Sequence, residues 1–115
     1  MIKIIFLILV FTQTLLSQDH WETAVFANDY WRYLVPDSEP VSNWNELSFD
    51  DSNWDEGVGG FGYGDGDDGT LTDQALSVYF RTDFNVEDLS KLSGAIISAD
   101  YDDGFIAYLN GIEVG

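Results

Sequence analysis

Apolar and polar positions alternate most clearly between residues 77 and 86. Every second residue from Val78 to Val86 is apolar or threonine, and the residues between them are Tyr, Arg, Asp and Asn. Successive side chains of a strand point to opposite faces of a sheet, so this period of two predicts a half-buried antiparallel strand.

Two shorter apolar runs also predict strands. Residues 30–35 form an aromatic and aliphatic run that we expect to end at Pro36, because proline cannot donate a hydrogen bond to a neighbouring strand. Residues 95–99 form a shorter and more apolar run, which predicts a second strand of this kind.

A hairpin is predicted near the end of the chain. Residues 105–109 read as a strand, and Asn110-Gly111 follows. Both central positions of a type I′ turn need positive φ, and this dipeptide adopts it readily. In that register Leu109 faces Ile112, and Ala107 faces Val114.

The middle of the chain predicts turns instead of helices. Residues 44–54 show no sustained helical period, and we expect Asp50-Asp51-Ser52 to form a capped turn that presents Phe49 and Trp54 inward. The glycine-rich run 59–64 has neither a basic residue nor a helix after it to hold phosphate, so it predicts an irregular strand.

The first 17 residues have the features of a targeting signal and not those of a folded domain. Lys3 precedes an unbroken apolar run from Ile4 to Phe11, and a small residue, Ser17, precedes Gln18. This layout predicts a secretory signal peptide cleaved near residue 17, with no stable membrane insertion afterwards. An uncleaved anchor is the alternative, but the apolar run is shorter than the roughly 18 residues that a spanning helix needs.

The remaining chain predicts one domain. Residues 18–29 form a mostly polar lead-in, and residues 30–115 form the expected β-domain. The return strand of the predicted hairpin leaves Phe105 without a partner, so we expect the domain to be incomplete at its C-terminal end. A short but complete final strand is the alternative.

Composition and charge narrow the possible partners. Four Lys and Arg stand against 21 Asp and Glu, which gives a net charge of −17, and the chain has no Cys and one His. A protein that binds nucleic acid or an anionic membrane surface needs clustered basic residues. This chain lacks such a cluster, so neither is expected as a partner. The absence of Cys excludes disulfides and thiolate metal sites.

Two acidic loops share the pattern D-x-D-D-G. Clustered carboxylates on a glycine-bent loop are ligands that Ca²⁺ prefers, although neither loop matches an EF-hand. The alternative is that both loops are solvated turns. No spacing selects a catalytic pair of carboxylates, and no nucleophile or dinucleotide motif occurs. The six candidate calcium ligands are Asp65, Asp67, Asp68, Asp100, Asp102 and Asp103.

Aromatic residues provide candidate sugar-binding platforms. Exposed Trp and Tyr rings stack on sugar rings while neighbouring polar groups bind the hydroxyls. Trp31, Trp44 and Tyr63 are the candidates, with Trp54 as a further possibility. The alternative for each is a place in the core, because a domain of this size needs its large residues to bury area.

Several pieces of the sequence, taken in order, resemble a galactose-binding-like β-sandwich. F-D-D-S-x-W at residues 49–54 and Y-L-N-G-x-E-V-G at 108–115 are similar to the N-terminal sugar-binding domain of family 2 glycoside hydrolases. G-Y-G-D-G-D at 62–67 and Y-F-R at 79–81 look more like accessory domains of secreted bacterial proteins with lamin-tail or CotH-type modules.

The resemblance implies an all-β, antiparallel jelly roll that is non-catalytic and binds glycans or packs against a neighbouring domain of the same protein. It also implies a structural Ca²⁺ and a secreted or cell-surface location in a bacterium. It implies a mainly structural role for the F-D-D-S-x-W motif, with Trp54 packed inward. Such domains continue past the N-G hairpin, where this chain stops.

Three functions follow as expectations. The first is a secreted, non-enzymatic accessory module that binds carbohydrate. The second is the N-terminal part of a secreted enzyme, such as a glycoside hydrolase or a CotH-type kinase. The third is a structural module for adhesion or packing.

Overall fold

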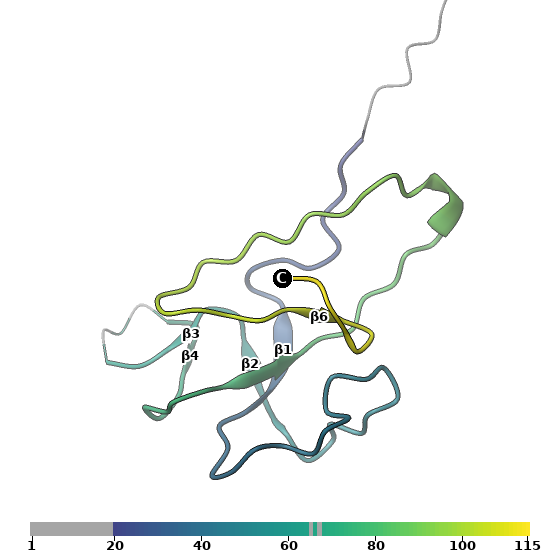
Figure 1. The fold of residues 1–115 in the computed structure, drawn as a ribbon. Helices are drawn as coiled ribbons and strands as arrows, with labels where there is room; N and C mark the ends of the chain where they lie inside the picture. The colour runs from purple at the N-terminus through teal and green to yellow at the C-terminus, as the bar shows by residue number, and fades with distance from the viewer. Residues whose placement is uncertain (1–19, 65, 67) are drawn as a thin grey trace, which may run out of the picture.

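The chain forms short strands joined by long irregular segments (Figure 1). The computed structural model describes residues 20–64, 66 and 68–115, so the predicted signal peptide at 1–17 lies outside the described residues. Its elements are β1 (Tyr30–Leu34), β2 (Asp55–Val58), β3 (Phe61–Gly62), β4 (Thr70–Leu71), β5 (Tyr79–Arg81), the 3-10 helix η1 (Leu89–Lys91), β6 (Tyr108–Leu109) and β7 (Ile112–Glu113). The described chain is therefore β-rich, as predicted. None of its helical structure is long and apolar enough to cross a membrane.

The largest sheet is antiparallel, with β1 between β2 and β5. Tyr33 of β1 lies opposite Asp55 on one side and Phe80 on the other. The predicted strand at residues 30–35 is confirmed, and it ends at Leu34, just before Val35 and Pro36. Proline cannot continue the ladder, which accounts for this end.

One face of this sheet is covered by the segment that contains β3 and β4. The Phe61 ring lies 5.2 Å from the Tyr33 ring and 4.7 Å from the Phe80 ring, measured between centroids. The Thr70 side chain lies over Gly57 and donates a hydrogen bond of 2.7 Å to the Val58 carbonyl. Any side chain at residue 57 would occupy the space of Thr70, so glycine is required there by close approach.

The opposite face carries Tyr79 and Arg81, and the chain from residue 41 to 54 packs against it. Trp54 is the buried residue of the described core, with 8% of its surface exposed, and the Phe49 ring lies 5.7 Å from it. The Asp50 carboxylate accepts a hydrogen bond of 3.0 Å from the Ser52 N–H. The predicted turn, with Phe49 and Trp54 inward, is confirmed.

The long strand predicted over residues 77–86 is wrong in its extent. Only Tyr79–Arg81 pairs with β1, and the chain leaves the sheet afterwards. The predicted burial also differs, because the Arg81 side chain is 9% exposed whereas Phe80 is 37% exposed. The turns at residues 41–54 cover the face of β5 that carries Arg81, so this polar face is not exposed to solvent.

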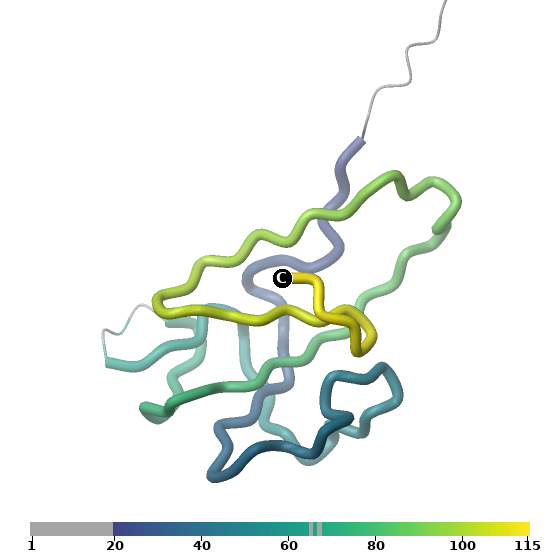
Figure 2. The backbone as a smooth tube through the Cα atoms, viewed as in Figure 1, coloured from purple at the N-terminus to yellow at the C-terminus, as the bar shows by residue number. Residues whose placement is uncertain are grey.

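The strand predicted at residues 95–99 is not formed. Figure 2 shows the backbone running from β5 out to η1 and back, apart from the three-stranded sheet. A strand needs a hydrogen-bonded neighbour, and this run has none in the described chain. Its side chains are exposed, with Ile96 at 74% and Ile97 at 59%.

The predicted hairpin is formed by β6 and β7. Leu109 pairs with Ile112, and Asn110 and Gly111 have φ values of 50° and 82°. The Val114 N–H donates to the Ala107 carbonyl at 2.8 Å, which continues the predicted register. The β6 strand is shorter than predicted, since only Tyr108–Leu109 of residues 105–109 is strand.

Candidate functional site

Arg81 joins the sheet to the turns at residues 41–54. Its Nε donates to the Asp51 carboxylate at 2.8 Å, and its guanidinium also donates to the carbonyls of Trp44 at 2.6 Å and Glu46 at 3.1 Å. The guanidinium lies 5.2 Å from the centre of the Phe49 ring. A planar group with five N–H donors satisfies several acceptors at once, so one side chain holds this whole segment.

The segment that Arg81 holds is a series of tight turns. The N–H groups of Trp44, Glu46 and Phe49 each donate to a carbonyl three residues earlier, at distances of 3.1 to 3.2 Å. Hydrogen bonds from Ser52, its side chain first and then its backbone, hold the pKa of Asp50 below the ordinary value of 3.8. Asn, Asp and Ser are common in this stretch because their side chains and conformations suit turns.

Trp44 places the hairpin beside these turns. Its ring stacks on Trp54 with centroids 6.2 Å apart, and it meets Tyr79 edge-on at 4.9 Å and Tyr108 edge-on at 5.7 Å. Tyr108 belongs to β6, so this contact ties the β6–β7 hairpin to the sheet through Trp44. Aromatic pairs in such arrangements contribute about 0.5 to 1.5 kcal/mol each beyond the area they bury.

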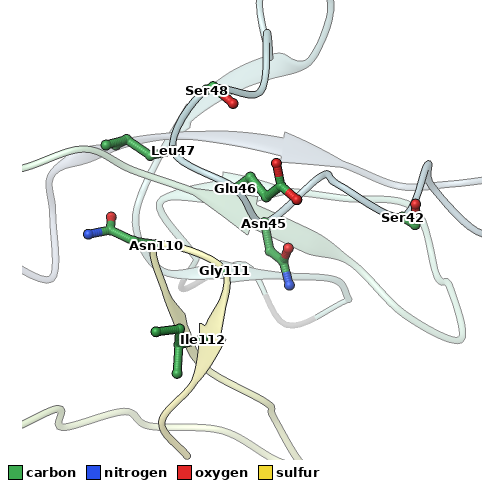
Figure 3. A pocket seen from close by; sticks show the side chains of 8 residues that line it. All are labelled: Ser42, Asn45, Glu46, Leu47, Ser48, Asn110, Gly111 and Ile112. Atoms are coloured by element: carbon green, nitrogen blue, oxygen red, sulfur yellow. The ribbon is translucent and has the colours of Figure 1, made fainter.

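A hollow of about 630 Å³ lies between the turns and the tip of the hairpin (Figure 3). Asn45 and Glu46 belong to the turn segment, and Asn110 and Gly111 to the hairpin. The two walls are close, because a Cβ placed on Gly111 would lie 3.5 Å from Cγ of Glu46. We call this feature the hairpin hollow; its other lining residues are Ser42, Leu47, Ser48 and Ile112.

The lining of the hairpin hollow combines neutral polar groups, one carboxylate and two aliphatic side chains. Two side-chain amides and two hydroxyls both donate and accept hydrogen bonds, and the Glu46 carboxylate only accepts. Leu47 and Ile112 add an apolar surface. This mixture suits a polyhydroxylated, uncharged ligand.

The three aromatic residues proposed as sugar platforms do not form one site. Trp31 lies opposite Gly57 in the sheet and, by alternation along β1, on the face away from Trp44. Trp44 is half-buried in the aromatic contacts described above. Tyr63 is 54% exposed, and its hydroxyl accepts a hydrogen bond of 3.4 Å from Gln74.

The six candidate calcium ligands are described only in part. Asp65 and Asp67 lie outside the described residues, and the Asp68 side chain lies against Gly62. Asp100, Asp102 and Asp103 are all exposed. Within the described ranges, no group of three or more His, Cys, Asp or Glu residues is placed to hold a metal ion. Calcium binding by the two acidic loops therefore stays a prediction.

A second hollow, of about 770 Å³, lies between residues 33–39 and 71–77. Its charged lining consists of Asp37, Glu39, Asp55 and Asp73, and Glu39 accepts a hydrogen bond of 3.4 Å from the Tyr79 hydroxyl. This second hollow is acidic like the chain as a whole, and its lining in the described chain contains no Lys, Arg or His.

The sequence pattern did not identify the hairpin hollow. Asn110-Gly111 was predictable as a turn, but Asn45 and Glu46 belong to no motif, and tertiary packing such as the Trp44–Tyr108 contact brings them beside it. The ion pair between Arg81 and Asp51 was equally hidden, although both residues stand in stretches that carry the resemblance. The available signal was that Arg81 is one of only two arginines in a chain with 21 acidic residues.

Fold and site together define a β-rich protein with a polar surface hollow between a turn segment and a hairpin. Comparisons with protein-family models, curated proteins and solved structures found no match to this chain. The function is therefore argued from the geometry of the site.

Proposed function

We propose that this chain is a secreted, non-catalytic accessory module that binds carbohydrate. In this proposal its strands belong to a galactose-binding-like β-sandwich, and the hairpin hollow is the ligand site. One observation carries the proposal: two asparagines, two serines and a glutamate line one open hollow of about 630 Å³ together with two aliphatic side chains. Such a set matches the hydroxyl groups and apolar faces of a sugar.

The contacts that fix the walls of the hairpin hollow also support ligand binding there. Arg81 fixes the carbonyls of Trp44 and Glu46, and Trp44 fixes the hairpin through Tyr108. Both walls are thus attached to the same half-buried contacts. A site whose walls are held in place loses less conformational entropy when a ligand binds.

The test is retention on insoluble polysaccharides, with Asn45→Ala as the variant. We expect the unaltered chain to be retained on at least one neutral polysaccharide and N45A to be retained at least fivefold less, because an amide contact is lost. Asn43→Ala is the matched control, since Asn43 lies in the same turns but does not line the hollow. Equal loss in both variants, or no retention of the unaltered chain on any polysaccharide, contradicts the proposal.

A second candidate function, packing against a neighbouring domain, is favoured by the exposed apolar side chains outside the sheet. Ile96, Ile97 and Ile106 are 74%, 59% and 62% exposed. If these side chains form one continuous apolar patch, that patch suits contact with another protein surface. Polysaccharide retention that survives Ile96→Ser but not N45A separates the two functions.

A further inference from the structure

We infer that the hairpin hollow binds uncharged sugars more tightly than sugars that carry a carboxylate. This inference rests on the proposed function, because it names the class of glycan that the same site accepts. Two observations carry it. The first is where the basic side chains of the described residues lie and which groups they contact, and the second is the negative charge of the residues that line the hollow.

Each basic side chain in the described part of the chain already has a carboxylate partner. His20 lies 3.2 Å from Glu22, and the distance between Lys91 and Asp88 is 3.6 Å. Arg32 pairs with Glu56 at 3.2 Å. His20, Lys91 and Arg32 do not line the hollow, so an anion bound there gains no cation from them.

Arg81 is the basic residue attached to the wall of the hollow, and it is the least available. Its side chain is 9% exposed, and its donors are directed to the Asp51 carboxylate and to the carbonyls of Trp44 and Glu46. These acceptors are part of the turn segment itself. Turning the guanidinium toward a ligand would release the wall that lines the hollow.

The lining itself is negative. Glu46 is its ionisable residue, and the other polar groups are amides and hydroxyls. Figure 3 shows the Glu46 and Asn45 side chains on the turn segment, with Asn110 and Ile112 on the hairpin. The amides and hydroxyls bind neutral hydroxyl groups without a charge, whereas Glu46 repels an anion placed beside it.

The size of this selection follows from Coulomb's law in water. Two like charges about 4 Å apart repel by about 1 kcal/mol, which corresponds to about fivefold in affinity for each anionic group beside Glu46. The net charge of −17 adds a longer-range repulsion that salt screens over about 8 to 10 Å.

The experiment compares oligosaccharides that differ only at C6, using the full chain. Galactose oligomers are paired with galacturonate oligomers, and glucose oligomers with glucuronate oligomers, in affinity titrations at 0.05 and 0.5 M NaCl. We expect the neutral member of the bound pair to bind at least fivefold more tightly at low salt, and the gap to narrow at high salt.

Two variants assign the selection to Glu46. Glu46→Gln should reduce the gap between neutral and anionic oligomers, whereas Glu87→Gln, which changes the net charge equally but does not line the hollow, should leave the gap nearly unchanged. Thermal melts test whether both variants are folded. The salt dependence of the unaltered chain tests the inference independently of any variant.

The outcomes separate the inference from the proposed function. Equal or tighter binding of the uronate oligomers overturns the charge selection and leaves carbohydrate binding standing. Binding of neither member of any pair overturns both. A gap that E46Q and E87Q reduce equally assigns the selection to the net charge and overturns the role of the hollow.

Discussion

Arg81 and Asp51 lie 30 residues apart in the sequence, and their side chains meet at 2.8 Å between Nε and Oδ2. Only 9% of the Arg81 side chain and 26% of the Asp51 side chain are exposed. The pair joins β5 to the turns that carry the aromatic residues Trp44 and Trp54. Together with the hydrogen bonds from Arg81 to the Trp44 and Glu46 carbonyls, it links the sheet to the candidate ligand site.

Arg81→Lys should destabilise the fold by about 2 kcal/mol, because an ammonium on a flexible chain cannot serve Asp51 and two carbonyls together. Urea unfolding followed by tryptophan fluorescence measures this loss. Arg32→Lys is the matched control: Arg32 is 38% exposed and pairs with Glu56, so less than about 1 kcal/mol is expected. Equal losses in the two variants would remove the special role assigned to Arg81.

Trp54→Ala should cost about 3 to 5 kcal/mol, since it leaves a cavity beneath Trp44 and Phe49. For a small domain, that loss removes most of the free energy of unfolding. The measurement is a thermal melt followed by circular dichroism. Trp21→Ala, at a position 65% exposed, should change stability by less than about 0.5 kcal/mol. A thermal midpoint that Trp54→Ala leaves unchanged would contradict the place of Trp54 in the core.

Gly111→Ala should destabilise the hairpin by about 1 to 2 kcal/mol, because a residue with a Cβ is strained at a φ of 82°. The space around the added methyl group is adequate, so the cost comes from the backbone. Gly94→Ala is the control, since nothing lies within 4 Å of the added Cβ and its φ is not positive. Chemical denaturation of both variants gives the comparison.

Hydrogen bonds from Ser90, its side chain first and then its backbone, hold the pKa of Asp88 below the ordinary value of 3.8. A lowered folded pKa adds stability above the unfolded pKa, and this stability is lost as pH falls through the folded pKa. Ser90→Ala should therefore raise the pKa of Asp88 and reduce stability at neutral pH, with the difference vanishing in acid. A carboxyl NMR titration checks this, and the pKa of Asp50 should stay unchanged.

Asp102→Asn should leave the thermal midpoint unchanged in chelator and in millimolar Ca²⁺. Asp100, Asp102 and Asp103 are exposed, and the described residues form no group that could hold a metal. If the folded chain does bind Ca²⁺, a Ca²⁺ concentration 100 times the dissociation constant should raise the free energy of unfolding of the unaltered protein by about 2.7 kcal/mol. A gain that D102N abolishes would show that this loop binds the metal after all.

Local patterns predicted the local elements. The strand before Pro36, the capped turn at Asp50 and the hairpin at Asn110-Gly111 all depend on backbone preferences of a few neighbouring residues. Such preferences act wherever the segment lies, so the sequence alone reveals them. The β-rich class follows from the same preferences summed along the chain.

Patterns that depended on a distant partner were predicted poorly. Residues 95–99 have the composition of a strand, yet no described strand pairs with them, and the alternation at 77–86 gave β5 too long an extent. A strand is stable only when another segment satisfies its N–H and C=O groups. Composition records the preference for strand, but it does not say where a partner lies.

The sequence by itself determined the acidic charge, the lack of cysteine chemistry, the tight turns and the β-rich class, because each is a property of single residues or near neighbours. Only the tertiary structure decided that Arg81 reaches Asp51, that Trp44 reaches Tyr108, and that Asn45 and Asn110 line one hollow. These contacts join residues 30 to 65 positions apart. Packing of the whole chain brings them together, and no local preference encodes that distance.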